Sequence, residues 1–370
     1  MSACDACLRR AALLGALAGW IARALDAHRR LPEVLALGDE ELVEGVCGLH
    51  RGRIDAAMKA FDPGVARHEA QEAGLWTVCR HTSRYPARLR ESSDAPAALY
   101  FSGSEARLET LRAEHAVAIV GSRRASPYGL EVAHALGREL SACAVPVVSG
   151  LAFGIDSSAH EGALAGGGLT VAVMPSGADY AYPRSKHRLH GRIGERGLVL
   201  SEMPPGARPY KWSFPARNRI MAGLASMTVV VEGNRSSGSL ITARFAQDLG
   251  REVGAVPGQV TSALAAGPNA LLSDGACVVR SAADVLDAVF GPGAREHRTR
   301  RLDPPLAPLL ARLLGAVEQG RTMESLAGAG EDVGEVLAGL TELELLGLVR
   351  RGPGGSYVRS AEGGAYACRE

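Results

Sequence analysis

The stretch VAIVGSRRASPYG, residues 117–129, decides the fold, because an apolar run passes through a glycine turn into a helix start. The strand predicted at Ala116–Val120 is apolar throughout, which is typical of strands buried on both faces of a parallel sheet. Similar runs alternate with helical stretches downstream, at residues 145–148, 169–173, 198–200, 227–231, 252–256 and 276–279. This alternation predicts a doubly wound α/β fold with a mostly parallel sheet.

The chain before residue 75 has a different pattern. Apolar residues recur at helical spacing from Leu13 to Leu25, and a second helical pattern follows. We therefore expect a small helical (SAM-like) module over residues 1–72, ahead of an α/β core at 75–290.

The C-terminal part of the chain, residues 306–370, is predicted to form a separate domain. Residues 291–305 are rich in Gly, Pro and Arg and are predicted to be a linker. Three helical patterns follow, a short one near 322–328 in the middle, and then two short strands flank a glycine-rich turn. This order predicts a winged helix over residues 306–370.

The composition is that of an ordinary globular chain: 370 residues, 46% hydrophobic and 22% charged, with a formal net charge of +1. This small net charge excludes a protein whose whole surface is positively charged, but it allows a local row of basic residues that neutralises phosphates. Seven scattered Cys, an odd number, indicate a reducing compartment, so we expect a cytoplasmic protein. The apolar stretch 11–22 is shorter than the roughly 20 residues that span a bilayer, so no membrane contact is expected.

Cys4 and Cys7 form a CxxC pair near the N-terminus. Structural zinc takes four ligands, and the sequence offers no second pair of Cys or His nearby. We therefore interpret both residues as incidental thiols and predict neither a metal site nor a cofactor.

Almost every predicted strand ends in a segment rich in Gly, Ser and Pro. In an open α/β sheet, ligands bind beyond the carboxyl ends of the strands. After the first strand, the amides of Gly121 and Ser122 and the guanidinium of Arg123 can hold a phosphate at a helix start. The alternative is a plain turn with a solvated Arg.

The loop SGLAFGID, residues 149–156, reaches the same edge. It contributes Ser149, Gly150, Gly154 and Asp156, and its glycines permit close approach to a ligand. Asp156 and His160 are expected to cap and pack the next helix rather than to act as acid and base, because no nucleophile or water partner is evident.

Two further segments carry positive charge or hydroxyl groups. A helix over residues 184–196 would place Lys186, His190 and Ile193 on one face. This face indicates either a basic surface beside the ligand site or a solvated amphipathic helix. Ser237 and Gly238 open another helix and offer an anion site or an ordinary cap.

The segment KWSFPARNRIMAGLAS, residues 211–226, is the most specific of these candidate binding segments. Arg217, Asn218 and Arg219 near a helix start can contact phosphates and base edges, and Trp212 or Phe214 can stack on a base. The alternative is that Arg217 or Arg219 pairs internally with a carboxylate at a neighbouring strand end. The candidates for that pairing are Glu202 and Glu232.

No catalytic motif accompanies these residues. The sequence has no HExxH, no GxSxG, no Walker A lysine and no carboxylate cluster for Mg²⁺. The polar residues therefore predict binding rather than catalysis.

In chain order these stretches resemble the DNA-processing protein A family (DprA, also called Smf). The matching stretches are VAIVGSRRASPYG, VVSGLAFGIDSSAH, GGLTVAVMPSGADYAYP, LSEMPPG, FPARNRIMAGLA, VVVEGNRSSGSLITA, GREVGAVPG and GPNALLSDGA. They cover roughly residues 116–280. The resemblance implies an extended Rossmann-like core that binds single-stranded DNA without sequence preference and forms a homodimer.

The resemblance also implies a recombination mediator that is not an enzyme. Such a protein protects incoming single-stranded DNA, counters single-strand-binding protein and loads the RecA recombinase, usually in natural transformation. By position, the family's DNA site falls on Gly121 to Arg123, on the loop 149–156 and on Phe214 to Arg219.

This sequence departs from the family pattern at a few positions. Lys186 stands where the family usually has Asn, so a phosphate contact is strengthened while a hydrogen-bond acceptor is lost. A nucleotide-binding or nucleotide-hydrolysing Rossmann-like sensor or enzyme remains an alternative. The PGGxGT motif of such enzymes is missing, and Pro257-Gly258-Gln259 is its nearest counterpart.

Overall fold

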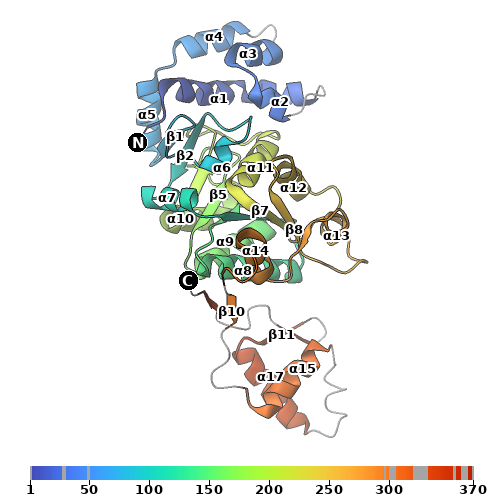
Figure 1. Cartoon of the computed structure of the whole chain (residues 1–370). Coiled ribbons are helices and arrows are strands. Elements are labelled where there is room, and N and C mark those ends of the chain that lie inside the picture. The colour runs from blue at the N-terminus through green and yellow to red at the C-terminus, as the bar shows by residue number, and fades with distance from the viewer. Residues whose placement is uncertain are drawn as a thin grey trace. The chain divides into compact units, whose positions relative to one another are not determined.

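The structure is a computed structural model that describes residues 2–26, 31–47, 51–295, 297–299, 306–319, 332–352, 356–359 and 366–368. These residues form two compact units, Met1–Ala294 and Arg295–Glu370. The first unit contains a nine-stranded sheet covered by helices, with the N-terminal helices packed beside it (Figure 1).

The sheet confirms the predicted α/β class. Its spatial order is β1-β2-β6-β5-β4-β3-β7-β8-β9, in which β3 to β9 are parallel and β2 runs antiparallel to both β6 and β1. The strands are β1 (Trp76–Cys79), β2 (Ala98–Ser102), β3 (Ala116–Val120), β4 (Val147–Ser149), β5 (Thr170–Val173), β6 (Leu198–Ser201), β7 (Ala225–Val230), β8 (Glu252–Ala255) and β9 (Cys277–Val278). The seven parallel strands correspond to the seven predicted runs.

The strand order reverses at β3. Strands β4 to β6 follow on one side of β3 and β7 to β9 on the other, so the loops after β3 and β7 leave the sheet in opposite directions. Such a reversal opens a crevice at the carboxyl ends of the strands, where doubly wound folds bind their ligands.

Helices cover both faces of the sheet (Figure 1). An apolar cluster that includes Leu89, Ile220 and Ala243 packs α6, α11 and α12 against one face, and α8, α9 and α10 cover the other. The helices of the core are α6 (Ala87–Arg90), α7 (Glu105–Ala113), α8 (Pro127–Ala142), α9 (Ile155–Ala165), α10 (His187–Arg196), α11 (Ser213–Leu224), α12 (Ser239–Asp248), α13 (Ala266–Ser273) and α14 (Ala282–Phe290).

The N-terminal residues form five helices that pack on the core. They are α1 (Asp5–Asp26), α2 (Leu31–Ala36), α3 (Asp39–Cys47), α4 (Arg51–Lys59) and α5 (Pro63–Glu72). Leu17 and Ile21 of α1 are fully buried in a cluster that also contains Trp212. The Trp212 Nε1 donates to the carbonyl of Ala18 at 2.7 Å, so the hypothesis that Trp212 stacks on a base is wrong. Among the described helices, none is both long enough and apolar enough for a membrane span.

The second unit has its own apolar core. Its elements are β10 (His297–Thr299), α15 (Pro308–Glu318), α17 (Val333–Leu345), β11 (Val349–Arg351), β12 (Tyr357–Arg359) and β13 (Tyr366–Cys368). Leu313, Leu340 and Leu343 join the two helices, and β11 pairs with β12 in an antiparallel hairpin. This arrangement is consistent with the predicted winged helix. The short helix expected near 322–328 and most of the linker expected at 291–305 lie outside the described residues.

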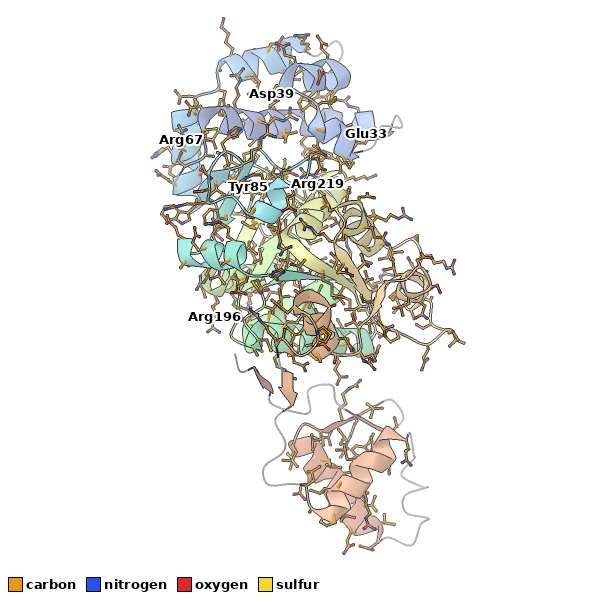
Figure 2. The ribbon with its side chains drawn as sticks, in the orientation of Figure 1. Glu33, Asp39, Arg67, Tyr85, Arg196 and Arg219 are labelled. Atoms are coloured by element: carbon orange, nitrogen blue, oxygen red, sulfur yellow. The ribbon has the colours of Figure 1, made fainter. Side chains whose placement is uncertain are left out.

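A buried ionic cluster joins α11 to the neighbouring loops. Arg219 donates to Glu202 at 2.5 Å and lies 3.5 Å from Asp94, and all three side chains are less than 10% exposed. Burial raises the pKa of Glu202, while Arg219 opposes that rise. Figure 2 places Arg219 close to Tyr85, on the side of the core next to the N-terminal helices. The internal pairing of Arg219 with Glu202, expected from the sequence as an alternative, is therefore present.

We predict that Glu202→Gln destabilises the first unit by about 3 kcal/mol, because the charge of Arg219 then stays buried with only Asp94 beside it. The matched control is Glu105→Gln, which removes an exposed pair with Arg84 and is expected to cost less than about 1 kcal/mol. Urea unfolding followed by tryptophan fluorescence measures both, since all three Trp lie in this unit. Equal losses in the two variants would contradict a strongly coupled buried pair.

Candidate nucleic-acid interface

A cavity of about 560 Å³ opens at the carboxyl edge of the sheet, where the strand order reverses. The loops after β3 and β7 and the first turns of α9 and α11 form its wall. Nine of the residues predicted from the sequence line it: Gly121, Ser122, Arg123, Asp156, Phe214, Arg217, Asn218, Ser237 and Gly238.

Two neighbouring cavities share Arg123 with the first. The smaller one, of about 70 Å³, adds Gly150, Phe153 and Tyr182. The larger one, of about 680 Å³, adds Gly154 and Lys186. Because Arg123 borders all three, they form one extended depression across the sheet edge, which we call the groove.

Arg217 forms the floor of the groove. It is only 5% exposed, its guanidinium donates to the Val173 carbonyl at 2.9 Å, and its Nε has no hydrogen-bond partner among the described residues. Burial lowers the pKa of Arg217 to about 10, and the nearby Asp156 partly offsets this. The side chain therefore remains charged at neutral pH and adds a fixed positive charge beneath the groove.

Two glycines make this packing possible. A Cβ on Gly150 would lie 1.5 Å from a terminal nitrogen of Arg217, so no larger residue fits above the guanidinium. Gly154 has a φ of +74°, and a Cβ there would lie 2.2 Å from the Ser122 carbonyl oxygen. The loop after β4 is thus pressed against both Arg217 and the turn after β3.

Asp156 and His160, which lie near the groove, are buried in structural contacts. Asp156 lies in the first turn of α9 and accepts a hydrogen bond from the Ala152 amide at 3.4 Å. Burial raises the pKa of Asp156, and Arg217 counteracts the rise. His160 bonds through Nδ1 to the Thr170 hydroxyl at 2.8 Å, and burial lowers its pKa to about 3. His160 is therefore neutral at pH 7.

Two cations of the groove, Arg123 and Lys186, lie over aromatic rings. The Arg123 guanidinium is 5.2 Å from the centre of the Phe214 ring, and the Lys186 ammonium is 5.7 Å from that of Phe153. Arg123 is solvent-exposed and forms no ion pair with any described residue. A guanidinium that stacks through its face keeps its N–H donors directed outward, where a phosphate can reach them.

Sequence reasoning missed two aromatic residues of the groove. Phe153 is 45% exposed and Tyr182 is 37% exposed, and the Tyr182 ring packs edge-on against Phe214 with 5.5 Å between centres. Single aromatic residues in loops usually indicate packing. The position of Phe153 directly before a glycine at a strand end was the available signal.

Several predicted residues lie elsewhere. Ser149 is fully buried and its hydroxyl donates to the Ile119 carbonyl at 2.6 Å, so it joins β4 to β3 and does not reach the groove. Arg219 is held by Glu202 on the opposite side of α11, as described above. Asn218 lines the groove but is 9% exposed, and its amide donates to the Gly238 carbonyl at 3.3 Å.

The helical face predicted for Lys186, His190 and Ile193 is wrong. Ile193 is fully buried, and the His190 Nε2 bonds to the Ala178 carbonyl at 2.9 Å. Lys186 ends the 3-10 turn Arg184–Lys186 and is the N-cap residue of α10, and it lines the groove.

Glu232, the other carboxylate considered for the Arg side chains, has a different partner. It accepts hydrogen bonds from the amide of Ser126 at 2.8 Å and from its hydroxyl at 2.5 Å. The Glu232 carboxylate therefore occupies the start of α8. The starts of α9 and α12 border the groove instead.

The profile of the family described as DNA recombination-mediator protein A matches residues 76–290. The chain belongs to this family. A curated relative from the family, the DNA processing protein DprA of Bacillus subtilis (strain 168), is 38% identical over 232 residues, which are 62% of this chain and 77% of the relative.

Solved DprA structures agree with the fold. The X-ray structure of DprA from Streptococcus pneumoniae matches with a TM-score of 0.62 and 33% identity, over 78% of this chain and 99% of that one. A DprA structure from Helicobacter pylori, which concerns the binding mode of that protein for single-stranded DNA, matches with a TM-score of 0.52 and 30% identity. It covers 58% of this chain and 94% of the other.

We predict that Gly150→Ala destabilises the first unit by about 1–3 kcal/mol, because the new methyl group forces the Arg217 guanidinium out of its place. Gly191→Ala in α10 is the matched control, since a Cβ there meets nothing within 4 Å and a helical Gly→Ala exchange is expected to stabilise by up to about 1 kcal/mol. Thermal unfolding of both variants tests this. A Gly150→Ala protein as stable as the wild type would contradict the close packing of Gly150 on Arg217.

Proposed function

We propose that the groove binds single-stranded DNA without sequence preference. The observation that carries the proposal is Arg123, an exposed guanidinium that makes no ion pair with a described residue and borders all three cavities of the groove. An extended open depression with one shared cation fits a flexible polyanion better than it fits a single small ligand.

Phosphate contacts follow from the groups along the groove. Arg123, Arg124 and Lys186 are accessible cations that line it, and Arg217 adds a buried charge below them. Helices α9 and α12 start at the groove, and helix N-termini attract anions through their amides and dipole. Ser237 and Gly238 lie at the start of α12 and contribute hydroxyl and amide donors.

Base contacts are assigned to the aromatic residues. Phe153 and Tyr182 are partly exposed beside Phe214, so bases can stack on them. Stacking on an aromatic ring contributes about 1–3 kcal/mol per base and tolerates every base type. This combination of phosphate contacts and stacking supports binding that is independent of sequence.

We propose that binding in the groove involves no covalent chemistry. Asp156 is buried near Arg217 and accepts a hydrogen bond from the Ala152 amide, and His160 is bonded to Thr170, so these two titratable side chains serve packing and electrostatics. The contacts of these groups favour the binding function over the nucleotide-hydrolysing alternative, which needs a carboxylate or imidazole able to exchange protons with the ligand.

Membership of the recombination-mediator family places the chain in DNA recombination. We propose further that it protects incoming single-stranded DNA during transformation and loads RecA in the presence of single-strand-binding protein, as a homodimer in the cytoplasm. A strand-exchange assay with and without single-strand-binding protein tests this role. Faster RecA-dependent exchange on coated DNA is expected, and no acceleration would exclude loading.

We predict that Arg123→Ala weakens binding to oligo-dT about tenfold, the equivalent of one charge-assisted hydrogen bond of about 1.4 kcal/mol. The slope of log K against log salt should fall by about 0.7, since one phosphate contact is lost on a single strand. Fluorescence anisotropy over a salt series measures both quantities.

The matched control is Arg196→Ala, which removes the same charge from the last turn of α10. That turn directly precedes β6, so Arg196 lies at the amino edge of the sheet, opposite the groove, and Figure 2 places it far from Arg219. Its replacement should leave affinity and salt slope nearly unchanged. Equal effects of the two replacements would indicate binding through overall charge and would reject the groove as the site.

A further inference from the structure

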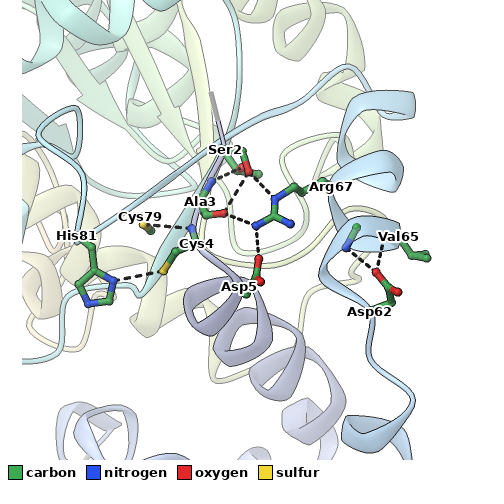
Figure 3. A network of polar contacts seen from close by, with 11 residues as sticks. Ser2, Ala3, Cys4, Asp5, Asp62, Val65, Arg67, Cys79 and His81 are labelled. Carbon is green, nitrogen blue, oxygen red and sulfur yellow. Dashed lines mark hydrogen bonds and ion pairs between the residues drawn. The ribbon is translucent and has the colours of Figure 1, made fainter.

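Three cysteines and one histidine from distant parts of the chain meet beside the start of α1. The ligand atoms of Cys4, Cys7, Cys79 and His81 all lie within 4.8 Å of one another. The His81 Nδ1 is 3.3 Å from the sulfur of Cys4 and 3.4 Å from that of Cys7. Figure 3 shows Cys4 in contact with both Cys79 and His81.

These spacings are close to those of a tetrahedral zinc site. With Zn–S bonds of about 2.3 Å and Zn–N bonds of about 2.0 Å, ligand atoms in a tetrahedron stand about 3.5–3.8 Å apart. Shifts of well under 1 Å therefore bring all four atoms to a common ion. Three Cys and one His form one of the ligand sets that structural zinc uses, and soft thiolate ligands in tetrahedral geometry favour zinc over harder cations.

The backbone around the cluster is held by further hydrogen bonds. The Ala3 amide donates to the Thr77 hydroxyl at 3.0 Å, and the Cys4 amide donates to the Cys79 sulfur at 3.5 Å. Arg67 of α5 bonds to the Ala3 carbonyl at 3.0 Å and pairs with Asp5 (Figure 3). The segment before α1 is therefore fixed along β1, and an amide bonded to sulfur is the kind of outer contact that supports a metal-bound thiolate.

Burial divides the four ligands into an inner and an outer pair. Cys79 and Cys7 are 0% and 2% exposed, Cys4 is partly exposed and His81 is exposed. Ions can thus enter from the side of His81, while the inner sulfurs are shielded from solvent. Four protein ligands leave no position for a substrate, which is the arrangement of a structural site rather than a catalytic one.

We propose that Cys4, Cys7, Cys79 and His81 bind one structural Zn²⁺ ion that ties the start of α1 to the end of β1. On binding, the protonated thiols release their protons to solvent and coordinate as thiolates. The ion cross-links the N-terminal helices to the sheet across about 70 residues, which restricts the unfolded chain and stabilises the contact between helices and core. This site is independent of the groove and of what the groove binds.

The sequence analysis, which predicted no metal, considered only close neighbours of Cys4 and Cys7. The second half of the ligand set is Cys79-Arg80-His81, at the end of a short strand that the sequence analysis did not predict. Only the antiparallel pairing of β1 with β2 at the sheet edge brings this segment next to α1.

The test uses the reduced, full-length chain. Elemental analysis should give about one zinc per chain, and Co²⁺ in place of zinc should give the visible absorption of a tetrahedral thiolate site. Cys4→Ser removes a partly exposed ligand without opening the core and should weaken zinc affinity by more than about 100-fold in competition with a chelator. Cys277→Ser on β9 removes a distant thiol and should leave zinc content unchanged.

Stability and DNA binding provide the second measurement. A chelator should lower the melting temperature of the wild type and of Cys277→Ser, but hardly that of Cys4→Ser, while oligo-dT affinity stays the same in all three. A wild-type chain without zinc and without thiolate–Co²⁺ absorption would overturn the proposal. Equal zinc retention by both variants, or a Cys4–Cys7 disulfide in place of the metal, would overturn it as well.

Discussion

The buried guanidinium of Arg217 is the interaction on which the carboxyl edge of the sheet depends. It donates to the Val173 carbonyl, lies beside Asp156 and occupies the volume that a side chain at position 150 would take. A buried charge of this kind is costly unless it is paired and hydrogen-bonded, so its neighbours must hold their places. The loop after β4, the first turn of α9 and helix α11 are positioned together by this one contact.

The groove follows from that arrangement. Arg217 is buried below, so the accessible positive charge belongs to side chains that line the groove, among them Arg123 and Lys186, each of which lies over an aromatic ring. Arg219, the other Arg in this part of α11, is neutralised locally by Glu202. A formal net charge of +1 is compatible with a local cluster of cations along the groove, because the distribution of charge and not its sum decides what binds.

The sequence predicted the parallel sheet well, because strands buried on both faces are continuous apolar runs and glycine turns mark their ends. It did not single out β1 and β2, which are apolar but short, precede the strand–helix alternation and pair antiparallel at one side of the sheet. The groove loops were predicted by composition, but the roles within them were not. Whether Arg217 or Arg219 faces the groove depends on the rotation of α11, and the positions of Cys79 and His81 depend on the pairing of an edge strand.

Co-crystallisation of the full chain with oligo-dT tests the central claim most directly. We predict that the sugar-phosphate backbone runs through the groove, with a phosphate at hydrogen-bond distance from Arg123 above a buried Arg217, and with a base against Phe153 or Tyr182. DNA bound on another surface, with the groove filled only by solvent, would contradict it.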